Sequence, residues 1–271
     1  MTVLGSGSRG NAVLVESDGV RLLVDAGFSG RDLERRLAES GIDPATLTAL
    51  LVTHDHSDHT RGMGVAARRW GIPLYLTEPT RRVCQSLLDG TEEVRLYTSA
   101  HPVEVGGLVV TPFLTVHDAV DPVAVTVTEA ATGEKLGIAT DLGRATATVR
   151  AALRGCHVLV LESNHDEILL RESHYPWSVK ARIGGSHGHL SNRAAAELVR
   201  ELHHDDLCAV VLAHLSENAN DPGLAHDVVG ESLSRLRYAG SLDVAGQERP
   251  METIDVTRAR KLRLPPQTTL F

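Results

Sequence analysis

Short apolar runs alternate with amphipathic stretches along most of the chain. Apolar runs bounded by turn-forming or polar residues predict strands, which we expect at residues 12–16, 20–24, 49–52, 72–76, 94–98, 108–115, 124–128, 136–140, 158–161, 209–212 and 242–245. Apolar residues that recur at helical spacing predict helices at residues 29–40, 61–70, 80–88, 146–154, 191–202 and 224–238. This order of elements indicates an α/β protein.

The first predicted helix has recognisable ends. Leu33 and Leu37 lie four residues apart among Arg and Glu, so they would form one apolar face. Ser29 is a suitable N-cap, and Gly41 is a suitable stop.

No repeat, low-complexity tract or linker interrupts this pattern. We therefore expect one domain over residues 1–271. Residues 171–190 look irregular and polar, and residues 258–263 form a basic tail that we expect to be solvated.

Ionisable residues stand at the ends of six predicted strands. They are Asp25, His54, His117, Asp141, Glu162 and His214. Each one taken alone is compatible with an ordinary loop, and Asp25 is also compatible with a turn cap. The whole series indicates a functional site at one edge of a sheet.

The densest polar cluster follows the apolar run at residues 49–52. Residues 54–59 read His-Asp-His-Ser-Asp-His. Side chains two residues apart in extended chain point the same way, so His54 and His56 can bind one metal ion together. Asp58 and His59 follow on the same loop and can face a second ion. Imidazole and carboxylate suit zinc, manganese or iron, so the spacing predicts a metal site; a solvated polar loop is the alternative.

The charge balance limits how the chain could bind nucleic acid. Asp and Glu number 35 against 27 Lys and Arg, which gives a formal net charge of −8. This argues against binding through global positive charge. A local basic groove remains compatible with it, and two bound dications would add strong local positive charge.

Cysteine usage and hydropathy favour a cytoplasmic protein. Cys84, Cys156 and Cys208 are widely spaced and have apolar neighbours, which predicts reduced core thiols. The first residues lack the basic and apolar segments of a signal peptide. No apolar run approaches the roughly 20 residues that span a bilayer, so we expect no membrane association. The pattern predicts no particular oligomeric state.

The order of these motifs resembles that of the metallo-β-lactamase-fold hydrolases. The resemblance rests on Asp25, the block at 54–59, His117, Asp141 and His214, and it covers nearly the whole chain. It implies a four-layer αβ/βα sandwich with two divalent metal ions, zinc or manganese, at one edge.

The resemblance also implies the role of each ligand. The first ion would be bound by His54, His56 and His117. The second would be bound by Asp58, His59 and His214. Asp141 would bridge both ions, and Asp25 would support the ligands.

Further segments resemble the YycJ/WalJ-type branch, which is linked to 5′→3′ exonuclease activity on DNA. They are residues 5–11, 117–119, 121–122, 161–165, 188–192 and 214–218. The glycine-rich loop at 5–11 departs from the spacing of the branch. The tRNase Z nucleases share Asp141 and a pair resembling Glu162 and His189. Two absences favour the YycJ/WalJ-type reading: the chain has no long exosite arm for tRNA and no inserted β-CASP domain.

The favoured function is a dinuclear phosphodiesterase that acts on nucleic acid, DNA rather than RNA, and releases 5′-phosphorylated products. The alternatives are a thioesterase-like or lactonase-like hydrolase of small molecules, an RNA-processing nuclease and a non-enzymatic binding protein. The complete ligand set argues against a binding protein. The Glu162/His189 pair argues against thioesters and lactones, because these leave with little help from an acid.

Two groups of residues complete the predicted site. Asp58, Glu162 and His189 are the candidate catalytic residues, with His189 as general acid and Glu162 orienting it; a structural contact is the alternative for this pair. Candidates to hold phosphate are Ser6, Asn11, Arg182, Ser191 and Asn192, with a structural role as the alternative for each.

Overall fold

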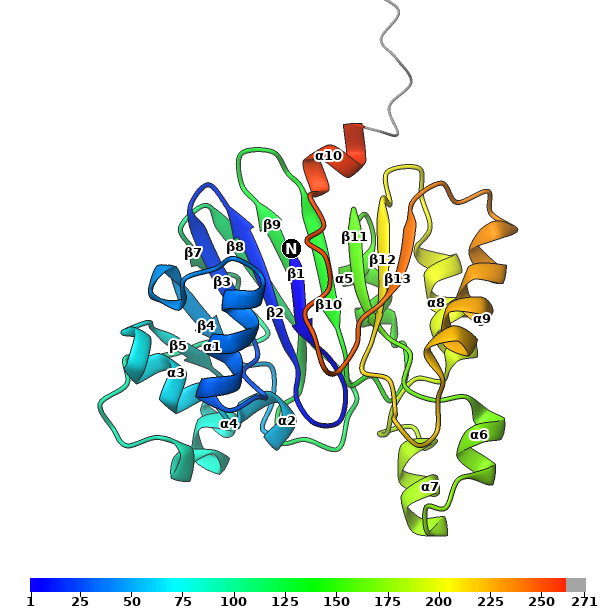
Figure 1. Cartoon of the computed structure of the whole chain (residues 1–271), viewed down its shortest axis with the longest axis horizontal. Helices are drawn as coiled ribbons and strands as arrows, with labels where there is room; N and C mark the ends of the chain where they lie inside the picture. The colour runs from blue at the N-terminus through cyan, green and yellow to red at the C-terminus, as the bar shows by residue number, and fades with distance from the viewer. Residues whose placement is uncertain (262–271) are drawn as a thin grey trace, which may run out of the picture.

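Two β-sheets face each other in the computed structural model, which describes residues 1–261 (Figure 1). The first sheet has the order β1 (Thr2–Gly5), β2 (Ala12–Ser17), β3 (Val20–Val24), β4 (Ala49–Leu51), β5 (Leu74–Leu76) and β6 (Val94–Leu96). The second has the order β13 (Ser241–Val244), β12 (Ala209–Ala213), β11 (Val158–Glu162), β10 (Lys135–Ala139), β9 (Val123–Glu129), β8 (Leu108–Leu114) and β7 (Val103–Val105). Strands β3 to β6 are parallel, as are β10 to β13, so their carboxyl ends meet at common edges.

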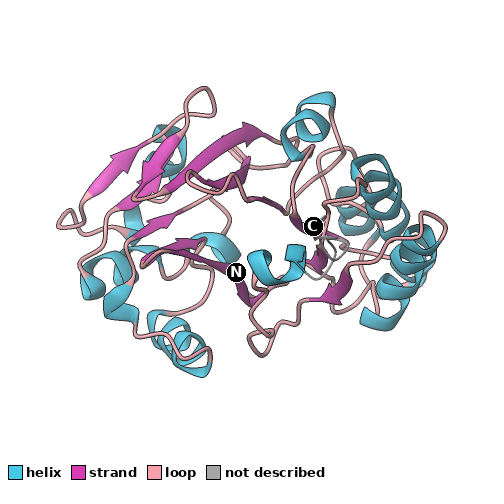
Figure 2. Ribbon diagram, turned by 90° about the horizontal axis from the view of Figure 1, so that it is seen from above, coloured by secondary structure: helices cyan, strands magenta, loops and turns pink. Residues whose placement is uncertain are grey.

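Helices cover the outer face of each sheet (Figure 2). On the first sheet these include α1 (Gly30–Glu39), α3 (Met63–Trp70) and α4 (Glu78–Val83). On the second they include α5 (Ala147–Leu153), α8 (Asn192–Leu202) and α9 (Pro222–Ser234). An apolar core fills the space between the sheets, and a separate core lies beneath each helical layer. The four-layer sandwich predicted from the sequence is confirmed.

Helix α1 shows how local sequence places a helix on its sheet. Leu33 and Leu37 are completely buried and pack in the core beneath the helix. The Asp32 N–H donates to the Ser29 side chain, which caps the helix as predicted.

Several short elements were not anticipated. Four of them are β1, β7, α6 (Glu167–Glu172) and α10 (Val256–Lys261). Strands and helices of this length are too short to show a period of their own. The expectation that residues 171–190 are irregular was wrong at α7 (Trp177–Ile183), which lies between Pro176 and Gly184.

The placement of the metal motif also needs one correction. Asp58 and His59 were expected on a loop, but they lie in the single-turn helix α2 (Ser57–Thr60). His56 takes its N-cap position. The helix brings Asp58 and His59 back toward the strand ends, which a continuing loop would not ensure.

The C-terminal expectations are only partly covered by the structure. Residues 258–261 of the basic tail lie in α10, where Arg260 forms an ion pair with Glu134 at 3.4 Å. Residues 262–263 lie outside the described residues, and so does the end of the single domain expected over 1–271, which stays a prediction. Within residues 1–261, no helix combines the length and apolarity needed to span a bilayer.

Candidate metal centre

The six strand-end residues predicted from the sequence converge on one edge of the sandwich. Three of them have left-handed backbone: φ is +64° at Asp25, +58° at Asp141 and +56° at His214. This conformation is uncommon for residues other than glycine and turns the chain sharply. Strained backbone that persists at three strand ends is typical of a functional site.

The predicted ligands form two neighbouring groups. Ligand atoms of the first group lie within 4.8 Å of one another and come from His54, His56, His117 and Asp141. The second group meets the same limit and comprises Asp58, His59 and His214.

Asp141 stands between the two groups. Its Oδ1 lies 3.3 Å from His117 Nε2, and its Oδ2 lies 3.1 Å from His59 Nε2. Burial disfavours the carboxylate, but His214 and His59 outweigh burial and hold the pKa of Asp141 well below its usual value. This is the position and charge that a bridging ligand needs.

Two buried carboxylates orient histidines of the second group. Nδ1 of His59 donates to Asp25 Oδ2 at 2.8 Å, and Nδ1 of His214 donates to Glu162 Oε1 at 2.9 Å. Each bond leaves Nε2 facing the cluster, which is the usual arrangement for a metal-binding imidazole. The expectation that Asp25 supports the ligands agrees with this contact.

Charge in the cluster is unevenly distributed. Burial lowers the pKa of His54 well below its usual value, so this imidazole is neutral at pH 7. Burial also opposes charge on His59, but Asp25 and Asp141 outweigh it and raise the pKa of His59 well above the usual value. Binding of a cation would displace a proton from His59, which couples metal affinity to pH.

Two buried atoms test whether a metal fits. Among residues 1–261, four buried side-chain atoms make no hydrogen bond, and two of these are Nε2 of His54 and Oδ2 of Asp141, which still lies 3.1 Å from His59 Nε2. Buried polar atoms without partners cost free energy and require an explanation. Both belong to predicted ligands, and imidazole with carboxylate is a donor set for divalent metals. The residues therefore fit metal binding, while the assignment of each ligand stays a prediction.

Glu162 links the metal ligands to the candidate general acid. Its Oε1 accepts from Nδ1 of His189 at 2.8 Å as well as from His214. Its Oε2 accepts from the backbone N–H groups of Leu142 at 2.8 Å and Leu190 at 3.0 Å. Burial alone would raise the pKa of Glu162, but the contacts with His189 and His214 outweigh burial and lower it to about 2. The contact with His189 agrees with the sequence-based pairing, whereas the contact with His214 was not anticipated.

Four of the five phosphate candidates are buried and bonded within the protein. The Ser6 hydroxyl donates to Asn11 Oδ1 at 2.8 Å and accepts from the His214 N–H at 2.8 Å. Ser191 caps α8, and the Asn192 side chain bonds to those of Ser163 and Asn220.

Arg182 is the exposed member of this set. Its side chain is 67% exposed, and its Nε lies 3.5 Å from Asp118 Oδ2. Binding of phosphate by any of the five residues stays a prediction.

Sequence reasoning missed three hydrogen-bond partners that hold the histidines of the first ligand group in place. Two are backbone carbonyls: Gly188 O accepts from His117 Nδ1 at 3.0 Å, and Asp118 O accepts from His56 Nε2 at 3.2 Å. Thr53 is the third, because its hydroxyl donates to Asp25 and lies 3.0 Å from His54 Nδ1. A carbonyl leaves no signature in the sequence, whereas Thr53 could have been noticed as the polar neighbour of His54.

Comparison with known proteins places the chain in a family. Residues 20–214 match the model of the β-lactamase superfamily domain. The chain is 35% identical to exodeoxyribonuclease YycJ of Bacillus anthracis, over 88% of this chain and 90% of the relative. It is 32% identical to exodeoxyribonuclease WalJ of Streptococcus pneumoniae, over 89% of this chain and 91% of the relative.

A solved structure gives the same fold. The metallo-β-lactamase-fold protein YhfI from Bacillus subtilis matches with a TM-score of 0.69, over 93% of this chain and 98% of that chain. Its sequence identity of 18% supports likeness of fold alone. The family resemblance seen in the sequence is thus confirmed, and the chain belongs to the metallo-β-lactamase superfamily, in the branch that contains YycJ and WalJ.

Proposed function

We propose that the protein is a metal-dependent phosphodiesterase that degrades DNA from a 5′ end and releases 5′-phosphorylated products. Similarity over most of both chains to two proteins named exodeoxyribonucleases carries the proposal. The mostly buried His and Asp cluster supports it, because two-metal hydrolysis of a phosphodiester needs side chains that can hold the ions. All three cysteines are buried thiols, which supports action in the reducing cytoplasm.

The predicted ligands divide the work of holding two ions, zinc or manganese. The first group would hold one ion, the second group the other, and Asp141 both. When bound, the ions would supply Lewis-acid stabilisation of the phosphate charge and a nucleophile at neutral pH. Asp25 and Glu162 fix the histidines so that little reorganisation is needed during reaction.

The surroundings of His189 support a role at the leaving group. Its ring centre lies 5.0 Å from that of His117 and 5.1 Å from that of His214, so it stands beside both ligand groups. Its Nδ1–H donates to Glu162, so in the doubly protonated imidazolium form Nε2 would carry the proton for the departing 3′-oxygen. An alkoxide is a poor leaving group, and a positioned general acid accelerates such a step by about 10²–10⁴-fold.

A digestion with a 3′-labelled, 5′-phosphorylated DNA oligonucleotide tests this function. With added manganese or zinc, we expect 3′-labelled fragments that shorten progressively from the 5′ end, and no cleavage with chelator. Immediate loss of the label as a mononucleotide would contradict the polarity. Faster cleavage of matched RNA would favour an RNA-processing nuclease. Brisk thioester hydrolysis without digestion of either nucleic acid would overturn the proposal.

A further inference from the structure

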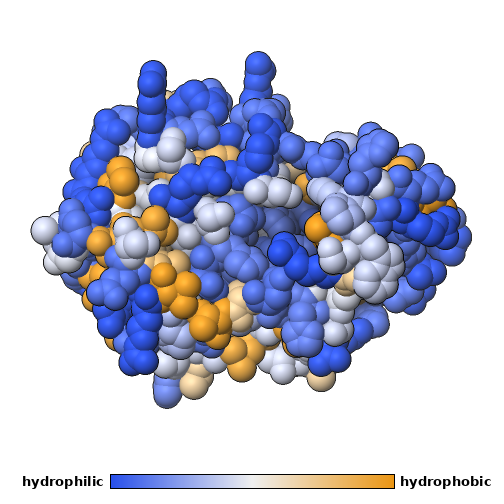
Figure 3. Space-filling view, turned by 90° about the horizontal axis from the view of Figure 1, so that it is seen from below, coloured by the Kyte–Doolittle hydropathy of each residue, from blue (hydrophilic) through white to orange (hydrophobic). Residues whose placement is uncertain are grey.

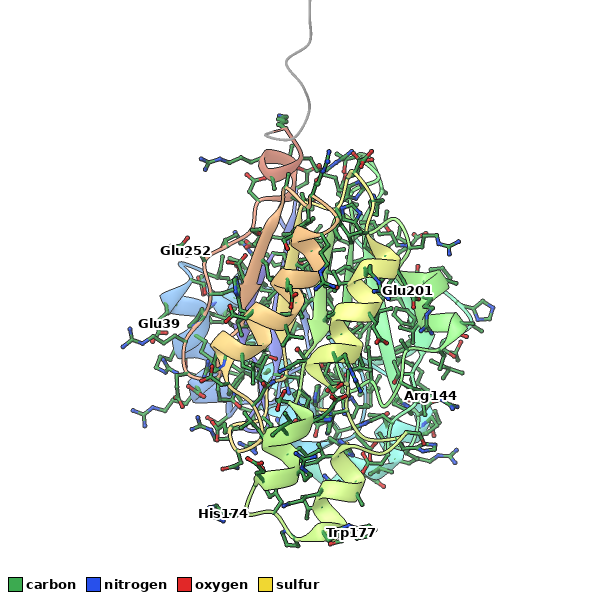
Figure 4. All side chains as sticks on the ribbon, turned by 90° about the vertical axis from the view of Figure 1, so that its right-hand side faces the viewer. Glu39, Arg144, His174, Trp177, Glu201 and Glu252 are labelled. Carbon is green, nitrogen blue, oxygen red and sulfur yellow. The ribbon has the colours of Figure 1, made fainter. Side chains whose placement is uncertain are left out.

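The hairpin of helices α6 and α7 projects beyond the sheets on the side of the metal centre (Figure 1). His174 and Trp177 lie at its tip (Figure 4). Seen from below, the molecule presents mainly hydrophilic side chains around a recess (Figure 3).

The hairpin has a small core that does not include Trp177. Leu170, Ile183 and Ala219 form this core, with Tyr175 and Val179 packed against it. The Tyr175 hydroxyl accepts from Asn218 Nδ2 at 2.9 Å, which ties the hairpin to the loop after β12. Trp177, in contrast, is 82% exposed. The fold of the hairpin therefore gives no reason for a tryptophan at this position.

Charge around Trp177 differs from that of the whole chain. Residues 173–196 contain no Asp or Glu but include Lys180, Arg182 and Arg193, although the protein as a whole carries −8. A groove of ≈ 380 Å³ between the two helices is lined by Trp177 together with Arg171, Lys180 and three other residues. Glu167 is the one acid in its lining, and it is paired with Arg193 at 3.0 Å. An aromatic ring and two cationic side chains therefore share one groove.

Helix α7 leads directly from Trp177 to the metal centre. Its penultimate residue, Arg182, lies 3.5 Å from Asp118, the neighbour of His117. Its last carbonyl, on Ile183, accepts from the His189 N–H at 2.9 Å. Arg182 lies five positions after Trp177, which corresponds to roughly 7.5 Å along a helix axis.

We propose that the α6–α7 hairpin holds single-stranded DNA as it enters the metal centre, with a base stacked on Trp177 and phosphates beside Lys180 and Arg182. The inference rests on the proposed function. Sequence-independent proteins that bind single strands combine aromatic platforms with cationic grooves in this way. Charge complementarity favours a polyanion here over an apolar protein partner.

Two substitutions of Trp177 separate stacking from general apolar contact. Trp177→Phe keeps an aromatic face, and Trp177→Leu keeps only apolar bulk. We expect KM for a 5′-phosphorylated oligodeoxythymidylate to rise about tenfold in Trp177→Leu and less than threefold in Trp177→Phe. The kcat/KM ratio of the oligonucleotide to bis(p-nitrophenyl) phosphate should fall about tenfold in Trp177→Leu alone. Ile168→Ala, at a position on α6 that is 54% exposed and outside the groove lining, is the matched control with unchanged KM.

Fluorescence gives a second readout that needs no turnover. The chain has two tryptophans, so Trp70→Phe leaves Trp177 as the sole tryptophan, whose emission can be excited selectively above the absorption of the four tyrosines. A hydrolysis-resistant phosphorothioate oligodeoxythymidylate should quench this emission in the zinc-loaded variant, and added salt should weaken the effect. Absence of quenching, or wild-type KM in Trp177→Leu, would overturn the inference. If the wild-type enzyme digests DNA in that case, the proposed function stands. Quenching without digestion would instead overturn the proposed nuclease function and support DNA binding by the hairpin.

Discussion

Glu162 is the residue on which the hydrogen bonds of the centre converge. Its two oxygens accept from two imidazoles and two backbone N–H groups, although the side chain is completely buried. An unpaired carboxylate in this position would be costly, so the four bonds account for its ionised state. One residue thus fixes the tautomer of a metal ligand, His214, and of the candidate general acid, His189.

A leaving-group test distinguishes the roles available to His189. We expect His189→Ala to slow DNA cleavage by about 10²–10⁴-fold, because the alkoxide then departs without a proton. Cleavage of a p-nitrophenyl phosphodiester should change little, since its phenolate leaves unprotonated. Steady-state rates on both substrates and elemental analysis would measure this.

His187 provides the matched control, as an exposed histidine in the same loop. His187→Ala should leave both rates and the metal content unchanged. Equal slowing of the two substrates by His189→Ala would show that His189 positions the substrate or the loop and does not donate the proton.

Helix α2 is held in place by the loop between β1 and β2 and by the segment that follows β3. The carbonyls of Asp58 and His59 accept from the backbone N–H groups of Asn11 and Ala26, both at 2.8 Å. Gly27 lies so close that a Cβ there would stand 1.6 Å from the Asp58 carbonyl oxygen. The position of Asp58 and His59 therefore depends on a glycine at position 27.

Gly27→Ala should displace α2. Because the clash is with backbone, we expect a loss of about 3 kcal/mol in the free energy of unfolding, together with reduced metal content. Chemical denaturation and elemental analysis would show both effects. Gly246→Ala is the control, since its Cβ would meet nothing within 4 Å. Wild-type stability and metal content in Gly27→Ala would mean that α2 does not depend on this contact.

The contacts around α2 also show what the sequence could and could not predict. The strands that end near Asp25 and His54 were predictable, because a buried run followed by a polar residue is a local pattern. Helix α2 was not, since its single turn is stabilised by bonds to loops far away in sequence. The bond between Glu162 and His214 was missed for a related reason: spacing along the chain does not encode how two strand ends face each other.

At the scale of the whole molecule, the two sheets contribute different parts of the metal centre. The segment after β4 in the first sheet supplies His54, His56, Asp58 and His59. Segments after strands of the second sheet supply His117, Asp141 and His214. Metal ions bound by both sets would tie the sheets together at their edge, in addition to the apolar core between them.

Metal removal should therefore lower the thermal stability of the whole protein. An ion present at 100 times its dissociation constant stabilises the folded state by about 2.7 kcal/mol. For a chain of this size, that corresponds to a rise in Tm of roughly 5–10 °C per ion. Calorimetry with metal and with chelator would measure the shift.

Substitutions of the predicted ligands should reduce the metal-induced rise in Tm by different amounts. Asp141→Ala should remove most of it, because Asp141 lies between the two groups and would bridge both ions. His117→Ala should remove about half, because His117 belongs to the first group alone. His226→Ala, on the exposed face of α9, should retain the full shift. Since each variant is compared with and without metal, any effect of the substitution on the metal-free protein cancels. An equal, full shift in Asp141→Ala and the control would show that Asp141 binds neither ion.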